Sequence, residues 1–470
     1  MALSSFCKTT RRSRVLLTGA LLALLLAAAC EAPSGDAPAA AAGDGSDAGV
    51  SAAPGDHRAA DASSTSDASA PSARDVELAR MQAHLDSLYS QNDVVHRFTT
   101  AWGDPVDCVP FAKQPGFSLV GTMNGAAPVL AAVRGLDSAA AIAGFGDGVD
   151  ADGHARSCPS GAVPIRRLTI QDLARFATLE EFFSKAPLHG GSGVVDADGN
   201  IHEHAYYTES SIPNWGAQVT INVWNPAIEV DDNSISQLWV TGGLDGQLQT
   251  LEAGYVAHKK YFGDPSSRLF IYSTADAYAG KTQPQCWDLG CKAFVQLADT
   301  HILLGGKFDK ASTLHGEQRE FKLRWQFCPQ TECLGWEGWW LHYDGGSTSE
   351  WVGFYPRSRY ASPGARDGAD RLDFGGEVAF TRGSAHTTTD MGSGQPASAG
   401  FGGAAYQTDL LRITPAHAWA GIGEIVQGDE VPNCYASGPL TTFTGPPTSV
   451  TPLPKQTFYF GGTGRSTVCK

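Results

Sequence analysis

Two glutamates lie in segments whose other residues are mostly apolar or small, and such lone carboxylates are candidates for chemistry. Glu252 lies in the segment 247–255, and Glu377 follows two glycines in the segment 373–380. We interpret both segments as strands, in which a charged side chain must be solvated, paired or kept for a reaction, because burying it alone is very costly. Two carboxyls close together could activate a water molecule without a metal. The alternative is that each glutamate is a structural carboxylate bonded to backbone or to an arginine.

The residues around these glutamates resemble the two glutamate motifs of the neprosin family of glutamic endopeptidases. The first motif is Leu-Glu-Ala-Gly-Tyr around Glu252, and the second is Phe-Gly-Gly-Glu-Val around Glu377. The resemblance covers roughly residues 95 to 470, in the same order as in the family. The other matching segments are Asp107-Cys-Val-Pro110, Lys113-Gln-Pro115, Val163-Pro-Ile-Arg-Arg167, Asn222-Val-Trp-Asn-Pro226, Ser236-Gln-Leu-Trp239, Met391-Gly-Ser-Gly394 and Gly400-Phe-Gly-Gly403.

The resemblance implies that Glu252 and Glu377 are the catalytic pair of a glutamic-type peptidase. Two carboxyls at short range cannot both ionise easily, so at acid pH the pair shares one proton. The ionised member takes a proton from a water that attacks the peptide carbonyl, and the protonated member hydrogen-bonds the carbonyl oxygen. The pair titrates as a unit, which leaves the roles open; our working assignment makes Glu252 the base and Glu377 the acid.

Members of the neprosin family cut after proline, so the resemblance implies a proline-containing peptide or protein as substrate. A proline ring needs a flat apolar slot, which aromatic side chains could line, and a glutamine on the strand face of one of them could orient water or peptide. Packing in the core explains each of these residues, taken singly, at least as well. The substrate-binding candidates are Gln237, Trp239, Tyr255, Trp351 and Tyr355.

The composition predicts an all-β catalytic domain. The chain has 470 residues, with 54 Gly, 11 Trp, 13 Tyr and 21 Phe, and many short alternating segments are separated by turn residues. This pattern is typical of an antiparallel β-sandwich, in which two sheets pack face to face. Strands are expected at 217–224, 235–240, 248–256, 268–273, 293–297, 321–327, 336–343, 350–355, 374–380 and 456–459.

The first 73 residues have the features of an export leader and a tether. Residues 1–29 are predicted to be a signal peptide, because basic residues precede an apolar run too short to span a membrane comfortably. The small residues before Cys30 resemble a bacterial lipobox, although Ala27 stands where leucine is usual. We therefore expect lipidation of Cys30 and an exported protein of the bacterial cell envelope; the alternative is an ordinary cleaved leader with a free cysteine. Residues 30–73, which are rich in Ala, Ser, Gly and Asp, are predicted to form a disordered linker.

Residues 74–190 are expected to form a small α+β domain that resembles the neprosin propeptide, which would make the protein a zymogen. Helices are predicted at 74–90 and 169–183, and strands at 117–122 and 128–133. We place the boundary near residues 189–193, with the peptidase domain at 200–470. Cleavage there would release the peptidase from its anchor, provided that no disulfide joins the two domains.

The cysteines indicate disulfides. The chain has 10 cysteines; Cys7 leaves with the leader and Cys30 would carry lipid, so an even number of eight remains in an exported protein. Short spacing favours two local pairs, and two of the expected pairs match cysteine positions in plant members of the family. Zinc is the alternative for the two Cys-x4-Cys pairs. The expected pairs are Cys108 with Cys158, Cys286 with Cys291, Cys328 with Cys333, and Cys434 with Cys469.

The remaining features favour no nucleic-acid partner and no cofactor. The formal net charge of −15 should repel nucleic acids and anionic membranes, so membrane contact is expected only through the lipid. His202-Glu-His204 could bind a metal, but it lacks the four-residue spacing of helical metalloprotease motifs. The segments 150–153 and 196–199 lack the closing glutamate of a calcium loop and predict turns.

Two other functions stay open, as does the oligomeric state. One is a non-catalytic β-sandwich that binds peptide or glycan at the cell surface, and the other is a metallohydrolase that uses His202 and His204. The separation of the two glutamate carboxyls distinguishes the first of these from a peptidase, because a catalytic pair must reach one water.

Overall fold

Strands with alternating burial build most of the chain after residue 200. In β11 (Glu320–Cys328), the side chains of Phe321, Leu323 and Trp325 are buried, and the residues between them are partly exposed. This period of two is expected for a sheet with one face in the core. The computed structural model describes residues 71–120, 140–185, 194–195, 200–243, 247–280, 285–329, 335–346, 348–381, 385–423, 425–429, 431–443 and 455–470.

The first sheet of the sandwich has seven strands and carries both glutamates. Its described pairs are all antiparallel. In order across the sheet, the strands are β17 (Val426–Gln427), β5 (Asn200–Asn214), β14 (Ala369–Thr381), β7 (Asn233–Gly242), β8 (Gln249–His258) and β9 (Arg268–Tyr272), with β4 (Val194–Val195) paired to β5.

The second sheet has ten strands and is also antiparallel. In order, its strands are β10 (Val295–Gln296), β13 (Ser349–Pro356), β12 (Gly338–Asp344), β11, β6 (Gly216–Asn222), β15 (Ala405–Ile413), β20 (Lys455–Gly461) and β18 (Ala436–Ser437), with β16 (Trp419–Gly421) paired to β15 and β19 (Thr441–Phe443) paired to β20.

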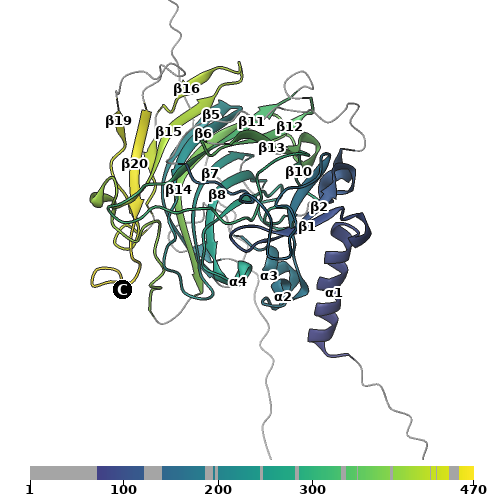
Figure 1. The fold of residues 1–470 in the computed structure, drawn as a ribbon. Helices are drawn as coiled ribbons and strands as arrows, with labels where there is room; N and C mark the ends of the chain where they lie inside the picture. The colour runs from purple at the N-terminus through teal and green to yellow at the C-terminus, as the bar shows by residue number, and fades with distance from the viewer. Residues whose placement is uncertain are drawn as a thin grey trace, which may run out of the picture. The chain divides into compact units, whose positions relative to one another are not determined.

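The two sheets pack face to face around one hydrophobic core (Figure 1). Leu238 and Leu251 of the first sheet are fully buried there, as are Trp325 and Leu341 of the second. Removing this much apolar surface from water is the main force that holds the sheets together. The predicted fold class, an antiparallel two-sheet β-sandwich, is confirmed.

The predicted strand segments between 217 and 459 each overlap an observed strand. β15 was not predicted, because its pairing with β6 shifts register between Thr408 and Leu411 and Asp409 has a left-handed backbone, with a φ of 57°. Such a bulge breaks the alternation on which a strand prediction depends.

The N-terminal region, which we define as the described residues between 71 and 185, combines short helices with a small sheet. The predicted helix at 169–183 is two short helices, each with a threonine cap. The predicted strand at 117–122 is wrong: residues Pro115–Leu119 form a 3-10 helix that begins at a proline, which pre-sets the helical φ. The predicted strand at 128–133 lies outside the described residues. The elements are α1 (Ala73–Leu88), β1 (His96–Thr99), β2 (Pro105–Pro110), β3 (Ala162–Arg166), α2 (Ile170–Leu173) and α3 (Leu179–Phe183).

This N-terminal region packs against the outer face of the seven-stranded sheet, and residues 69–470 form one compact unit. Figure 1 shows α1, α2 and α3 together at one side of the sandwich, below β1 and β2. Two ion pairs across this contact, Arg268 with Asp104 and Lys260 with Glu181, add polar links. The buried apolar contact is made by Met81, Leu173, Phe176, Leu179 and Phe182 with Ile235, Val256, Tyr261, Phe262, Phe270, Tyr272 and Trp287.

Disulfides stabilise each part separately. Cys108–Cys158, Cys286–Cys291 and Cys434–Cys469 pair as predicted. Cys328 is also disulfide-bonded, and its predicted partner Cys333 lies outside the described residues. Among the cysteines that the structure describes, no bridge joins the N-terminal region to the sandwich.

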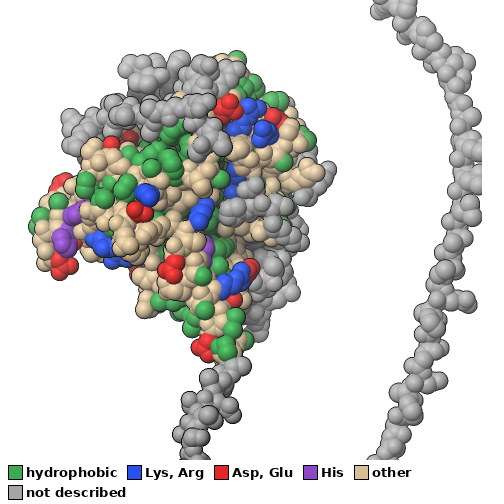
Figure 2. Space-filling view, turned by 90° about the vertical axis from the view of Figure 1, so that its right-hand side faces the viewer, with side chains coloured by type: hydrophobic (Ala, Val, Ile, Leu, Met, Phe, Trp, Pro, Cys, Tyr) green, Lys and Arg blue, Asp and Glu red, His purple; other side chains and the backbone are tan. Residues whose placement is uncertain are grey.

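The predicted signal peptide, Cys30, most of the linker and the boundary at 189–193 also lie outside the described residues. None of the helices within the described ranges is long and apolar enough to cross a membrane. On the face that Figure 2 shows, basic and acidic side chains are intermixed.

Candidate active site

Glu252 and Glu377 meet on the outer face of the seven-stranded sheet, opposite the sandwich core. β7 lies between their strands, β8 and β14, and Gln237 of β7 lies on the same face between them. Adjacent strands are about 4.8 Å apart, so carboxyls on alternate strands can converge across one strand. Both side chains are fully buried. We call Glu252 and Glu377 the dyad.

A lysine from the N-terminal region lies between the two carboxyls. The Nζ of Lys185 is 2.8 Å from Oε2 of Glu252 and 2.8 Å from Oε2 of Glu377. Burial alone would lower the pKa of Lys185, but the charges of the two carboxylates outweigh this effect and raise its pKa. Lys185 follows α3, whose Phe182 is packed against the sandwich, so the helix fixes where the ammonium lies.

Glu377 is surrounded by nitrogen donors. Nδ1 of His202 is 2.8 Å from Oε1, and Nε2 of Gln237 donates to Oε2 at 2.7 Å. Nε2 of His204 is 3.9 Å from Oε2. Burial alone would raise the pKa of Glu377, but the charge of Lys185 and the hydrogen bond from His202 hold this pKa well below its usual value. Glu377 is therefore ionised.

Glu252 is surrounded by hydroxyl donors instead. Oγ1 of Thr250 donates to Oε1 at 2.8 Å, and the hydroxyl of Tyr278 donates to the same oxygen at 2.5 Å. A hydroxyl can donate to a carboxylate or accept from a carboxylic acid, whereas the amide N–H groups of Gln237 can only donate. The dyad is therefore asymmetric: Glu377 is bound by nitrogen donors, and Glu252 is bound by hydroxyls that can either donate or accept.

The structure brings only part of the predicted substrate-binding set to the dyad. Gln237 binds Glu377, and the ring centre of Trp239 is 5.9 Å from Nζ of Lys185. Tyr255 points into the sandwich core, because alternation along β8 puts it on the face opposite Glu252. Tyr355 is also a core residue, and Trp351 packs against Trp340 on the other sheet. The expected aromatic slot is thus reduced to Trp239.

The glycines before Glu377 allow close approach of protein rather than of a ligand. A Cβ on Gly375 would lie 2.3 Å from the carbonyl oxygen of Ala205, and one on Gly376 would lie 2.6 Å from the ring of Phe460. These glycines let β14 pack tightly against β5 and against the second sheet. This close packing holds β14, and with it Glu377, in position.

The histidines of the His-Glu-His segment both face the dyad. His202 contacts Glu377, and the ring of His204 lies beside Trp239, with centroids 6.2 Å apart. Glu203 points to the opposite side of β5, where it pairs with His386. In the first of the two segments compared with a calcium loop, Asp150 accepts hydrogen bonds from the backbone N–H groups of Asp152 and His154, as in the predicted turn; the second segment, 196–199, lies outside the described residues.

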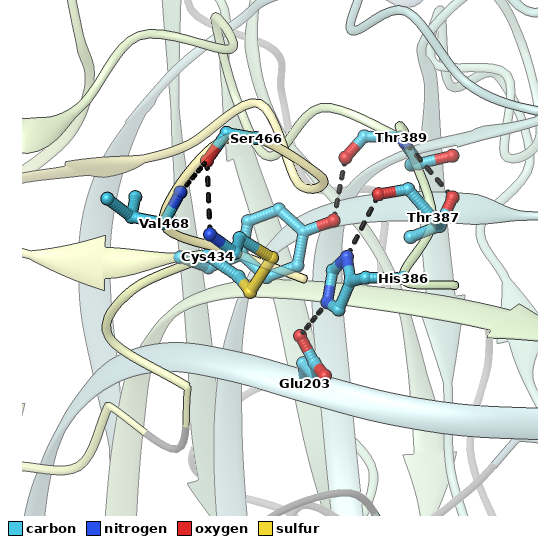
Figure 3. Close-up of a disulfide and its surroundings, with 9 residues drawn as sticks. Glu203, His386, Thr387, Thr389, Cys434, Ser466 and Val468 are labelled. Atoms are coloured by element: carbon cyan, nitrogen blue, oxygen red, sulfur yellow. Dashed lines mark hydrogen bonds and ion pairs between the residues drawn. A yellow bond between two sulfur atoms is a disulfide. The ribbon is translucent and has the colours of Figure 1, made fainter. Parts of the chain in front are cut away.

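The contact between Glu203 and His386 lies beside the Cys434–Cys469 disulfide, as Figure 3 shows. Nε2 of His386 is 2.8 Å from Glu203, and Nδ1 is 2.9 Å from the carbonyl oxygen of Thr387. Both neighbouring oxygens accept hydrogen bonds, so these contacts favour the form of the ring that carries two protons. Burial alone would lower the pKa of His386, but the hydrogen bond to Glu203 outweighs it and raises this pKa above the ordinary 6.5.

A raised pKa makes the contribution of His386 to stability depend on pH. This contribution is complete below pH 6.5 and is lost as the pH rises through the folded-state pKa. We expect His386→Gln to lower the unfolding free energy at pH 5 by on the order of 1 kcal/mol, since solvent partly screens the pair, and to have less effect at pH 8.5. Chemical denaturation at both pH values measures this, with the exposed His315→Gln as control. An equal loss at both pH values would contradict it.

Three residues of the site were not predicted from the sequence. Thr250 could have been found, because it shares a strand face with Glu252 two residues away. Lys185 and Tyr278 could not, since they reach the dyad from a helix end and a loop. All three contact a carboxyl of the dyad.

The fold and site together define an antiparallel β-sandwich with a buried carboxylate pair on the outer face of one sheet. The neprosin family model matches residues 230–463, which include both glutamates, so this part of the chain is a neprosin domain. This assignment supports a glutamic-type peptidase. Among solved structures, the crystal structure of Scytalido-glutamic peptidase with a peptide based transition state analog is similar, at 7% identity and a TM-score of 0.26, over 55% of this chain and 97% of that chain.

Proposed function

We propose that the protein is a latent glutamic endopeptidase whose dyad activates water. The observation that carries this proposal is that both Oε2 atoms lie 2.8 Å from one nitrogen atom. Once Lys185 leaves, a water in its place would touch both carboxyls. A non-catalytic binding module would not need two buried carboxyls to converge on one point.

We assign the roles from the partners of each carboxyl, which reverses our working assignment. The donors His202 and Gln237 remain with Glu377 after Lys185 leaves, and they favour its ionised form. Glu377 is therefore the base, and Glu252, whose partners among the described residues are two hydroxyls and Lys185, carries the shared proton at acid pH.

The reaction then proceeds in two steps. Glu377 takes a proton from the water, the water oxygen attacks the scissile carbonyl, and protonated Glu252 donates a hydrogen bond to the carbonyl oxygen. The proton taken by Glu377 passes to the leaving amine as the C–N bond breaks. Nε1 of Trp239 and Oε1 of Gln237 are buried with no hydrogen-bond partner among the described residues, so both are free to bind the peptide backbone.

The N-terminal region acts as a propeptide in this proposal. Lys185 occupies the position of the water and neutralises the dyad, and the surrounding helices cover part of the sheet face on which a substrate would lie. The precursor is therefore a zymogen. We also propose that it is exported and lipid-anchored through Cys30, since its leader resembles that of a bacterial lipoprotein apart from Ala27.

Cutting the chain between residues 185 and 200 should separate the two parts without reduction. The Cys108–Cys158 bridge lies within the N-terminal region, and Cys286–Cys291 and Cys434–Cys469 lie within the sandwich. After limited proteolysis we expect two fragments on a non-reducing denaturing gel. A single band that splits only with reductant would contradict separation of the parts.

An acid-pH digest of a peptide library by the processed enzyme, with the products sequenced, tests the activity and its specificity. We expect cleavage after proline, as the family resemblance implies, with the ring against Trp239. Products with no residue preference would reject the proline specificity and leave the dyad chemistry intact. No hydrolysis at any pH would reject the peptidase, and the binding module would then be the better proposal.

A further inference from the structure

The loop after β9 contains two consecutive non-glycine residues with a left-handed backbone. Ala277 has a φ of 56° and Tyr278 a φ of 62°, a conformation that is unfavourable for residues with a Cβ. Such residues persist where the surrounding structure holds them, and they cluster at functional sites. Here the second residue, Tyr278, contacts the dyad.

Hydrogen bonds hold this loop to β8, the strand of Glu252. The backbone N–H of Ala277 donates to the carbonyl of Leu248 at 2.9 Å, and that of Thr250 donates to the carbonyl of Thr274 at 3.0 Å. The backbone N–H of Tyr278 donates to Oγ1 of Thr274 at 2.8 Å. The loop therefore keeps Tyr278 at a fixed position relative to Glu252.

The hydroxyl of Tyr278 and that of Thr250 occupy one oxygen of Glu252. Both donate to Oε1, so Oε2 is the oxygen that faces Lys185 and Glu377. Burial and the charge of Glu252 raise the pKa of Tyr278 well above its usual value, so this hydroxyl keeps its proton over the working pH range. The ring also stacks on Tyr272, with centroids 6.1 Å apart and planes 14° apart, which limits its rotation.

We propose that Tyr278 is a positioning residue: with Thr250 it holds Oε1 of Glu252, so that Oε2 is the atom that donates the hydrogen bond to the carbonyl oxygen of the substrate. This role rests on the proposed peptidase function and extends it to a loop outside both glutamate segments. A hydroxyl donor favours the ionised form of the carboxylate that it binds. Tyr278 therefore also limits how far toward neutral pH the dyad keeps its shared proton.

The test is Tyr278→Phe in the processed enzyme, which removes one hydroxyl and keeps the ring. We expect kcat to fall about 10- to 100-fold, a part of the usual acid–base contribution, with KM nearly unchanged. The alkaline limb of the kcat profile should move to higher pH by about half a unit or more. In a Glu252→Gln background the same change should cause little further loss, because the residue acts through Glu252.

The matched control is Tyr207→Phe, which removes a hydroxyl that donates to the carbonyl of Gly438 away from the dyad; its kcat and pH profile should equal those of the parent. An unchanged kcat for Tyr278→Phe would overturn the proposal. So would a lower kcat with an unmoved alkaline limb, since that is the mark of a merely structural residue. An inactive parent enzyme would instead overturn the peptidase function, and this role with it.

Discussion

Glu377→Gln and Glu252→Gln should each abolish peptide hydrolysis by the processed enzyme, with kcat at least about 10³-fold below the parent. Glutamine has nearly the same shape as glutamate but cannot take a proton from water or donate one as an acid. Because the two carboxyls act on a single water, the double variant should be no worse than either single one. Initial rates on a proline-containing peptide at acid pH measure this loss.

Glu350→Gln is the matched control for these variants. Glu350 is also a buried glutamate with hydrogen-bond partners, Thr300 and His301, but it lies on the ten-stranded sheet. The control should lose some stability and keep its kcat. Activity in either dyad variant close to that of the parent, with the control also active, would refute the two-glutamate mechanism.

Lys185→Met should convert the latent precursor into one that hydrolyses peptides before processing. Methionine fills similar space but leaves the dyad charges without a partner, and removing one member of a buried ion pair costs about 3–5 kcal/mol. Inhibition by the N-terminal region should therefore weaken by roughly 100-fold or more. The measurement is peptide hydrolysis by a precursor that is kept intact, with intactness verified on a denaturing gel.

Lys260→Met controls for general weakening of the same contact. Lys260 pairs with Glu181 across the contact but does not reach the dyad, so this precursor should stay latent. Equal activity in both variants would mean that coverage of the sheet, rather than the ammonium, blocks the site.

Lowering the pH should weaken the inhibition of the parent precursor, as Lys185→Met does. The pKa of Glu377 is lowered in the folded state, so the ion pair contributes fully above the ordinary value of 4.5, and this contribution declines as the pH falls below it. Processing of the parent should therefore accelerate below about pH 4.5. A processing rate that is independent of pH between 3 and 6 would contradict this linkage.

The strands of the sandwich were predictable because alternation records which face is buried. The same alternation should have excluded Tyr255, whose side chain lies on the face opposite Glu252. Trp351 and Tyr355 do not lie beside the dyad for another reason. Their strand belongs to the second sheet, and no local pattern in the sequence tells which sheet a strand joins. Gln237 was found because it shares a face with Trp239.

The contacts that set the charge of the dyad depend on tertiary structure alone. Lys185 is separated from Glu377 by 192 residues, and Tyr278 from Glu252 by 26. Neither lies in a segment with a recognisable period. Their roles follow only when a helix end and a strained loop are seen to converge on the same face.

The separate disulfides of the two parts make inhibition depend on concentration after the chain is cut. Before the cut, the lysine is tethered to its own dyad at a high effective concentration, so dilution has no effect. After the cut, the N-terminal fragment is an ordinary competitive inhibitor. It dissociates when the solution is diluted and binds again when the protein is concentrated. Freshly cut protein should therefore stay inhibited at high concentration and become active on dilution.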